Sequence, residues 1–324
     1  MKRLSLIVLP LLLIVGCSKE PINIKILVER DGDYYTKDSN KPYTGPIFSL
    51  YDDESKEFEG NLINGLSDGP YKEYWKNGKI FIETTHKVGK THGPYKKYTE
   101  NGHLVEETTY NNGIWDGPSI SYHWESDIIE EEVYYKDGEW NGSYKTYFDN
   151  GQPYVNSNYK DGKVHGSSKV FHRNGQVHKD GFYINGKTDG PYKTYYNNGR
   201  PNWDWLYKNG KQEGYQVSYY RNGKKDFEET YKDGKNEGLT TSWYKNGQKK
   251  FELTYNNGIR ISSKSWDRDG QKFVKGTYKN GSKEDGVFRT WHSNEQINTQ
   301  ETYKNGELIS SKCWDEDGDE KECN

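Results

Sequence analysis

Aromatic side chains recur along this chain at a nearly constant spacing. Residues 185–208 read NGKTDGPYKTYYNNGRPNWDWLYK, and most of the chain repeats this stretch with substitutions. The anchor aromatic residues are mostly 24 positions apart, as Tyr195 and Tyr219 are. The anchor column contains Tyr74, Tyr98, Tyr122, Tyr147, Phe171, Tyr195, Tyr219 and Trp243, and it continues with Trp266, Trp291 and Trp314. A fixed period of this size indicates a tandem array, in which each unit packs mainly on its neighbours.

Each unit contains two turn signals of the Asn-Gly or Asp-Gly type. One set includes Asn77-Gly78 and Asn174-Gly175, and the other includes Asn64-Gly65 and Asn185-Gly186. Such dipeptides accept positive φ at both central positions of a type I′ turn, the favoured two-residue hairpin connection. The sequence therefore predicts an all-β fold: an elongated single antiparallel sheet of tandem β-hairpins, with type I′ turns in both sets.

Oppositely charged residues test the register of these hairpins. If Asn77 and Gly78 form the loop, Lys72 lies opposite Glu83. The same rule pairs Lys96 with Glu107, Lys169 with Asp180, and Lys193 with Asp204. Each facing pair contributes about 0.2–1 kcal/mol. A slip of one residue would lose all four pairs and exchange the two faces of the sheet, so this register is favoured.

Alternation along the strands then divides the aromatic residues between two faces. The anchor column shares a face with the ion pairs. The opposite face is the more apolar, and we expect it to be better buried; it carries Tyr71, Trp75, Tyr95, Tyr192, Tyr196, Trp203, Trp205, Tyr207, Phe227 and Phe251. Four of these are candidates for a binding surface: Tyr192, Tyr196, Trp203 and Trp205. Trp203 and Trp205, together with Tyr34 and Tyr35, are also candidates for stacking on a sugar, with purely structural packing as the alternative.

Composition favours an ordered protein although only 31% of the residues are hydrophobic. Disordered chains are poor in aromatic residues and usually carry a high net charge. This chain has 29 Tyr, 10 Trp and 10 Phe, and a net charge of −3. The balanced charge gives no basic face of the kind that nucleic-acid binding requires.

The N-terminus has the pattern of an export signal. Lys2 and Arg3 precede an apolar run from Leu4 to Val15, which is followed by Gly16 and Cys17. This pattern is typical of a secretory signal peptide, and the run is shorter than the roughly 20 residues of a membrane span. Its ending resembles the lipobox of bacterial lipoproteins. That resemblance implies that Cys17 is lipidated, and Ser18 after it implies sorting to the outer membrane. An ordinary cleaved signal is the alternative.

Five segments follow from these patterns. They are a signal peptide at 1–16, a lipidated tether with a first strand at 17–30, an N-terminal capping repeat at 31–63, regular repeats at 64–260, and divergent C-terminal repeats with a cap at 261–324. Cys313 and Cys323 flank a turn in this last segment. With Cys17 lipidated and the protein exported, we expect these two cysteines to form a disulfide, which could contribute about 2–3 kcal/mol and protect a sheet edge.

No pattern in the chain indicates an enzyme, a metal site or a cofactor. Asp315, Asp317 and Asp319 do not have the spacing of an EF-hand loop, and the eight histidines do not have zinc-site spacing. One carboxylate recurs in unit after unit, at Glu83, Glu107, Glu131, Asp180, Asp204, Glu228 and Glu252. A group repeated in this way is a partner in the charge ladder more readily than a catalyst.

The repeating unit itself resembles a known family. The stretches 207–223 and 231–247 follow the pattern Tyr-Lys-x-Gly-Lys-x-x-Gly, then Tyr and Asn-Gly, and resemble the bacterial variant of the MORN repeat. The resemblance covers nearly all of 31–324. Proteins of this kind are often assigned to the YwqK family of antitoxins, which implies direct binding of a toxin. We therefore expect a membrane-anchored, non-enzymatic scaffold for a protein partner; the alternative is an envelope glycan-binding or structural adhesion protein.

Overall fold

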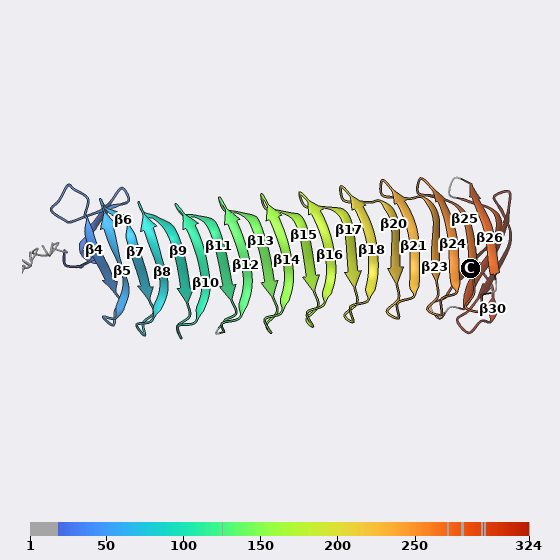
Figure 1. The fold of residues 1–324 in the computed structure, drawn as a ribbon, viewed down its shortest axis with the longest axis horizontal. Coiled ribbons are helices and arrows are strands. Elements are labelled where there is room, and N and C mark those ends of the chain that lie inside the picture. The colour runs from blue at the N-terminus through green and yellow to red at the C-terminus, as the bar shows by residue number, and fades with distance from the viewer. Residues whose placement is uncertain are drawn as a thin grey trace, which may run out of the picture. The chain divides into compact units, whose positions relative to one another are not determined.

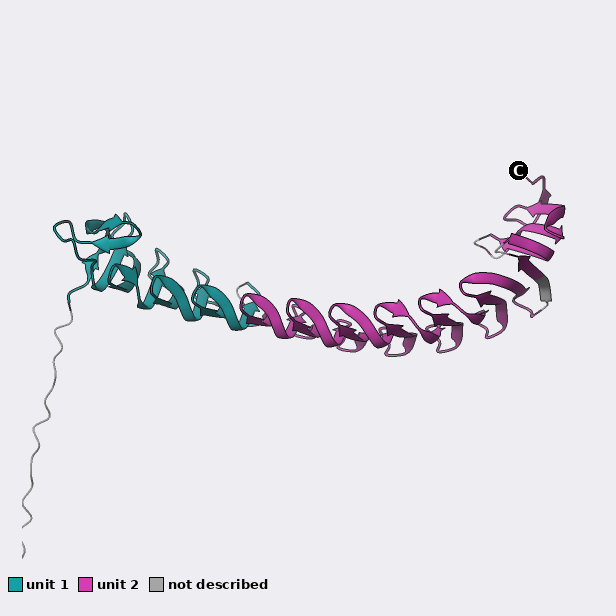
Figure 2. Cartoon of the chain, turned by 90° about the horizontal axis from the view of Figure 1, so that it is seen from above, with its two compact units in different colours: residues 1–127 teal, residues 128–324 magenta. Residues whose placement is uncertain are grey.

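The computed structural model describes residues 19–124, 126–270, 272–279, 282–292, 294 and 296–323. Cys17 and the expected signal peptide lie outside the described residues. The chain divides into two compact units, residues 1–127 and 128–324 (Figure 2). Within the described residues the one helix is a short 3-10 segment, so no helix there is suited to crossing a membrane.

Unit 1 is a run of antiparallel strands that pair in chain order (Figure 1). A short strand, β1, pairs in parallel with β4, and β2 and β3 form a separate hairpin. The elements are β1 (Ile22–Asn23), η1 (Ile24–Ile26), β2 (Val28–Arg30), β3 (Asp33–Tyr35), β4 (Gly45–Leu50), β5 (Lys56–Ile63), β6 (Leu66–Ser67), β7 (Gly69–Tyr74), β8 (Ile80–Lys87), β9 (Lys90–Tyr98), β10 (Leu104–Asn111) and β11 (Ile114–Tyr122).

Unit 2 repeats the same hairpin, and its strands also pair antiparallel in chain order. The strands are β12 (Ile129–Lys136), β13 (Glu139–Tyr147), β14 (Pro153–Lys160), β15 (Lys163–Phe171), β16 (Val177–Ile184), β17 (Lys187–Tyr195), β18 (Pro201–Lys208), β19 (Lys211–Gln212), β20 (Gly214–Tyr219), β21 (Lys225–Lys232), β22 (Lys235–Asn236), β23 (Gly238–Trp243), β24 (Lys249–Asn256), β25 (Ile259–Trp266), β26 (Lys272–Lys279), β27 (Ser282–Trp291), β28 (Ile297–Lys304), β29 (Glu307–Trp314) and β30 (Glu320–Lys321). The expected all-β fold of tandem hairpins is confirmed.

The two sets of turns differ, which corrects the expectation of type I′ turns in both. At Asn185-Gly186 both residues have positive φ, 50° and 79°, as a type I′ turn requires. At Asn77-Gly78 only the glycine does, at 81°. There Gly78 N donates to Trp75 O and Trp75 N donates to Lys79 O, both at 2.8 Å. This is a three-residue loop, a type I turn completed by a left-handed glycine.

The predicted register nevertheless holds. Lys72 pairs with Glu83 as expected, although the loop is one residue longer. The pairing shifts by one between Glu73 and Tyr74, so that Phe81 is an extra residue in β8. This β-bulge compensates for the extra loop residue, so the pairing beyond it is the same as with a two-residue loop. All four predicted ion pairs are present, at 3.0 Å for Lys72–Glu83, 3.2 Å for Lys96–Glu107, 3.2 Å for Lys169–Asp180 and 3.1 Å for Lys193–Asp204.

One member of the expected charge ladder is wrong. Glu131 lies opposite Thr146, on the other face, and the ladder position is taken by Glu132, whose carboxylate is 3.1 Å from Lys145 Nζ. The step from Tyr122 to Tyr147 is 25 residues, and the extra residue precedes β12. An insertion of one residue changes the phase of the following strand, because side chains alternate with a period of two.

We call the face that carries the ion pairs and anchor residues the first face, and the opposite one the second face. Most buried side chains lie on the second face, as expected, but many are small and polar. They include Thr84, Thr108, Ser157, Thr194, Ser218, Thr240 and Ser242, each no more than 7% exposed. The larger aromatic residues of this face, such as Tyr71 and Tyr192, stay partly exposed beside them.

Candidate interaction surface

The anchor residues of the first face are tied to the charge ladder. Tyr74 Oη donates to Glu59 at 2.6 Å, and Tyr122 Oη donates to Glu107 at 2.8 Å. Hydrogen bonds from Lys56 and from Tyr74 hold the pKa of Glu59 below its ordinary value. Lysines also lie over the anchor rings, with Lys56 Nζ 5.5 Å from the centroid of Tyr74. The anchor tyrosines therefore serve the array itself.

The predicted binding residues separate into two groups. Tyr192 and Trp205 stack on the second face with ring centroids 5.8 Å apart, and Trp203 lies 4.9 Å from Trp205. Burial raises the pKa of Tyr192 to about 12. Tyr196 instead follows β17 in the turn, where its hydroxyl donates to Tyr219 O at 2.8 Å. Tyr192, Trp203 and Trp205 thus form one cluster, while Tyr196 links one hairpin to the next.

Trp75 and Tyr196, which alternation assigned to the second face, make this link at the end of the hairpin. Both directly follow the anchor residue, outside the regular strand, and close the three-residue loop by pairing with Lys79 and Arg200. Trp75 Nε1 donates to Tyr98 O at 3.2 Å, and Tyr220 and Tyr244 make the equivalent bonds in later units. The residue after each anchor is therefore used between units, because the loop turns its side chain toward the next hairpin.

The first face of unit 2 also carries a feature that the sequence reasoning missed. Exposed apolar side chains project from neighbouring strands beside the ladder; this apolar row consists of Phe182 (44% exposed), Leu206 (39%), Tyr215 (53%) and Leu239 (50%). Pro191 pairs with Leu206 and continues the row between Phe182 and Leu206. The signal was available in the alternation, since each residue lies two positions from a ladder position.

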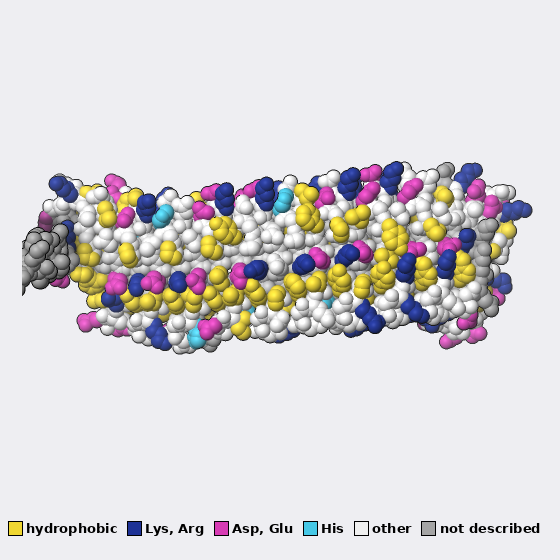
Figure 3. Space-filling view, in the orientation of Figure 1, with side chains coloured by type: hydrophobic (Ala, Val, Ile, Leu, Met, Phe, Trp, Pro, Cys, Tyr) yellow, Lys and Arg dark blue, Asp and Glu magenta, His cyan; other side chains and the backbone are white. Residues whose placement is uncertain are grey.

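The surface of the first face is therefore mixed. Figure 3 shows this face, on which acidic and basic side chains alternate along a line with hydrophobic side chains on both sides. The ladder ion pairs are about one-third to one-half exposed, so each contributes little to stability. Their regular spacing supplies polar groups next to the apolar row.

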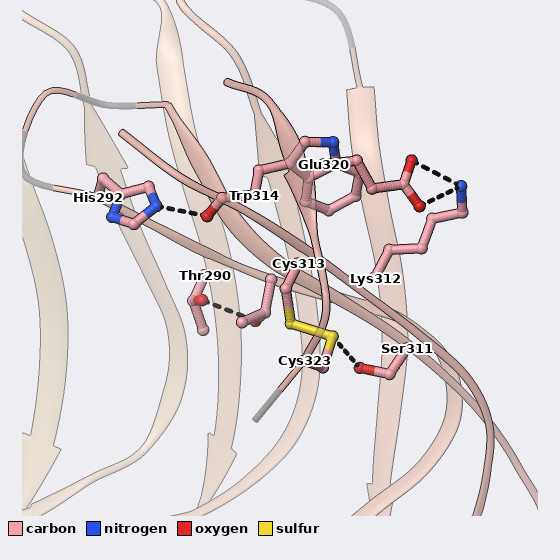
Figure 4. Close-up of a disulfide and its surroundings, with 9 residues drawn as sticks. Thr290, His292, Ser311, Lys312, Cys313, Trp314, Glu320 and Cys323 are labelled. Carbon is pink, nitrogen blue, oxygen red and sulfur yellow. Dashed lines mark hydrogen bonds and ion pairs between the residues drawn. A yellow bond between two sulfur atoms is a disulfide. The ribbon is translucent and has the colours of Figure 1, made fainter. Parts of the chain in front are cut away.

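The last hairpin contains a disulfide between Cys313 of β29 and Cys323, which follows β30 (Figure 4). Lys312 Nζ lies 3.1 Å from Glu320, and His292 Nε2 lies 2.8 Å from Trp314 O. Asp315 accepts backbone N–H groups of Asp317 and Asp319, which lowers the pKa of its carboxyl. Its Oδ1 thus stabilises the turn. Among the described residues no group of three His, Cys, Asp or Glu side chains is placed to hold a metal.

Comparison with known protein families finds a match to one repeat family. The family model described as the MORN repeat variant matches seven segments: 67–87, 91–112, 140–161, 164–185, 212–233, 236–257 and 284–305. The first six of these segments each contain an Asn-Gly turn, and the seventh covers most of β27 and all of β28. The search of the curated proteins found no match.

Among solved structures, the chain is similar to parts of toxin complex proteins. The structure of TcdB2-TccC3 is 10% identical over 84% of this chain and 18% of that chain, with a TM-score of 0.18. The Photorhabdus luminescens Tc holotoxin pore is 10% identical over 85% of this chain and 18% of that chain, also with a TM-score of 0.18. The chain thus spans less than a fifth of the length of these proteins.

Proposed function

We propose that this protein, a repeat scaffold with seven segments of the MORN repeat variant, is lipid-anchored at the bacterial outer membrane and binds a protein partner without catalysing a reaction. The specific form of this proposal is antitoxin-like or immunity-like neutralisation of a toxin by direct binding. The observation that carries it is the apolar row on the first face of unit 2. Thr230 of β21 interrupts the row between Tyr215 and Leu239. Exposed apolar side chains that gather on one face and are rimmed by polar groups are typical of protein interaction sites.

The chemistry of the row favours a protein over a glycan. Leu206 and Leu239 offer aliphatic surface between and beside the rings of Phe182 and Tyr215, and such a mixture packs against the apolar side chains of a protein. The rings of Tyr192 and Trp205 on the second face pack against each other. Five strands contribute to the row with Pro191 included, namely β16, β17, β18, β20 and β23, so a partner would contact several hairpins at once. The adjacent ladder would provide the polar rim of such an interface.

Lipid anchoring rests on the sequence Gly16-Cys17 after the apolar run. Stable attachment by acyl groups requires more than one chain, which the lipoprotein modification of an N-terminal cysteine supplies. Cells that express the full chain should incorporate labelled palmitate into it, and Cys17→Ser should abolish the label. A labelled Cys17→Ser chain would contradict the anchor.

The partner proposal is tested with the tagged full-length chain, purified from membranes in detergent. Proteins that co-purify are identified, expressed separately and titrated against the chain. The variant Leu206→Lys/Leu239→Lys should raise the dissociation constant at least tenfold, because it places charges in the centre of the interface. The matched control is Val88→Lys/Ile114→Lys, which changes residues 63% and 52% exposed in unit 1. Equal effects of both pairs would contradict the row as the interface.

If the chain acts as an antitoxin, the same partner must also be toxic. Expression of the partner alone should inhibit growth, and co-expression of the chain should relieve the inhibition, but not with the Leu206→Lys/Leu239→Lys variant. Retention of the chain on envelope polysaccharide, lost on changing Trp203 and Trp205, with no protein recovered, would favour the glycan-binding alternative.

A further inference from the structure

A hollow of about 350 Å³ opens on unit 2 between β24 and β28. Its apolar walls are Phe251, Leu253, Tyr278 and Phe288, and its lining also includes Arg260, Lys264, Lys283, Arg289 and Glu301. The volume lies within the range of about 300–1,000 Å³ that is usual for small-molecule sites. We propose that this hollow binds an organic carboxylate with an aromatic or similarly apolar body. The site is separate from the apolar row, so the inference does not rest on the proposed function.

The repeat explains why the space is empty. Tyr192 lies three residues before the anchor Tyr195, and its ring covers Gly181 on the neighbouring strand. The residue three positions before the anchor Trp266 is Ser263, which pairs with Gly276. Ser263 has no ring to fill the volume that Tyr71, Tyr95, Tyr144 and Tyr192 fill in their own units. Phe288 lies across Gly276 and closes one side of the space.

Three of the four cations already have partners. Lys283 forms an ion pair with Glu301, Lys264 Nζ lies 3.4 Å from Glu252, and Arg289 Nε donates to Gln300 at 2.7 Å. The fourth, Arg260, has its guanidinium carbon 4.0 Å from the ring centroid of Tyr278. Among the described residues no carboxylate or other acceptor bonds to this guanidinium. Its N–H donors are therefore available to a ligand.

The donors of Arg260 select the chemistry of that ligand. A guanidinium held on an aromatic face keeps its N–H groups in a fixed fork, which matches the two oxygens of a carboxylate. Beside Ser263 the lining holds the cations Arg260 and Lys283 against Glu301, an excess of positive charge that favours an anion. Lys264 and Arg289 lie at ladder positions, with their side chains on the first face. The apolar walls favour a ligand whose remaining part is a ring or a branched chain.

The test uses N-acetyl-L-phenylalanine as the probe and its uncharged amide as the matched ligand control. Binding to the full-length chain is measured by isothermal titration calorimetry. We expect the acid to bind at least tenfold more tightly than the amide. Arg260→Gln should lower the affinity for the acid at least tenfold. Arg200→Gln, at an exposed arginine outside the hollow, should leave this affinity unchanged. Equal binding of acid and amide, or unchanged affinity in Arg260→Gln, would overturn the proposal.

A second variant separates loss of the site from loss of folding. Ser263→Tyr introduces the ring that Tyr71, Tyr95, Tyr144 and Tyr192 provide at this position in their units, so it should fill the hollow and abolish binding while the circular dichroism spectrum is retained. Retained binding in a folded Ser263→Tyr chain would also overturn the proposal. A peptide that ends in phenylalanine distinguishes the sources of the carboxylate. If the peptide binds more tightly than the acetylated amino acid, the natural ligand is the C-terminus of a partner protein. If the two bind equally, the natural ligand is a free acid.

Discussion

At the scale of single residues, glycine and an aromatic ring form a recurrent pair on the second face. A Cβ at Gly60 would lie 2.8 Å from Tyr71 Cδ2, and one at Gly181 would lie 2.7 Å from Tyr192 Cδ2. Both glycines have φ outside the left-handed region, so space and not backbone conformation requires them. A ring that covers a strand glycine compensates for its missing side chain.

This pairing predicts the effect of Gly181→Ala. The added methyl group meets the Tyr192 ring and should destabilise unit 2 by about 1–3 kcal/mol through overpacking. Hydrogen exchange of the amides in β16 and β17 measures the change locally, which is preferable in an array that need not unfold in two states. In a Tyr192→Ala background the same substitution should be nearly neutral. An equal cost in both backgrounds would show that the contact is not the cause.

A buried carboxyl group is the second feature at this scale. Glu229 is 8% exposed and accepts a hydrogen bond from Asn236 at 2.6 Å. It pairs with Gln216, which is 1% exposed. Other units have an aromatic or a small residue at the position of Gln216. Burial raises the pKa of Glu229 above its ordinary value, because the low-dielectric surroundings disfavour the charged form.

The raised pKa of Glu229 predicts a pH dependence of stability. Below the unfolded-state pKa of about 4.3 the group is neutral in both states and has no effect. As pH rises above that value the unfolded state loses its proton first, so stability falls until the pH has passed the raised pKa of the folded state. Glu229→Gln should therefore raise the melting temperature at neutral pH and change it little near pH 4. A stabilisation that is the same at both pH values would contradict this account.

At the scale of the hairpin, each turn bonds to the next unit. Asn174 Oδ1 accepts from Gln176 N at 3.2 Å, while its Nδ2 donates to Asn197 O at 2.7 Å. Asn77, Asn222, Asn246 and Asn294 repeat the donation. At the other turn, Asp189 accepts from Asn209 N at 2.9 Å. Both ends of a hairpin are thus fixed by its neighbour.

Asn174→Asp should weaken the contact between hairpins. The aspartate can still accept from Gln176 N, but it places a carboxylate oxygen against Asn197 O, and the loss should be about 1 kcal/mol or more. The control is Asn150→Asp, because Asn150 accepts from Gln152 N and makes no side-chain donation among the described residues. Hydrogen exchange at the two turns should show faster opening only for Asn174→Asp. Similar changes at both turns would indicate a general effect of charge.

At the scale of the whole molecule, the array is built from exchangeable units. Within unit 2, the strands pair with their neighbours in chain order, so stability is expected to be a sum of unit and nearest-neighbour terms. Residues 190–213 are one complete period of 24 positions that begins at a unit glycine. Their removal joins Asp189 to Gly214, and Asp189 then takes the place of Glu213, which accepts from Asp233 N at 2.8 Å.

The chain without 190–213 should therefore fold, with a melting temperature within a few degrees of that of the intact chain. Removal of 190–201, half a period, should instead unfold this region, because it joins strands of opposite direction. Circular dichroism and thermal melting of the two deletions check this. Loss of folding in the full-period deletion would mean that unit 2 depends on contacts beyond neighbouring hairpins.

The agreement between expectation and structure follows the range of the forces involved. The strands and the four ion pairs were predictable because they depend on period and alternation, which are local. The turn at Asn77-Gly78 was not, because a loop of two residues and a loop of three with a compensating bulge give the same pairing of Lys72 with Glu83. Glu132 replaced Glu131 because one inserted residue shifts the phase without changing the motif.

By itself, the sequence determined the repeating hairpin, its register and the partition of side chains between two faces, because each follows from the alternation of side chains and from turn chemistry. Only the tertiary structure decided which side chains remain accessible. The exposure of Phe182, Leu206, Tyr215 and Leu239, the link through Tyr196 and the hollow above Ser263 depend on how one hairpin lies against the next. Packing between neighbours, not pattern within a unit, fixes these surfaces.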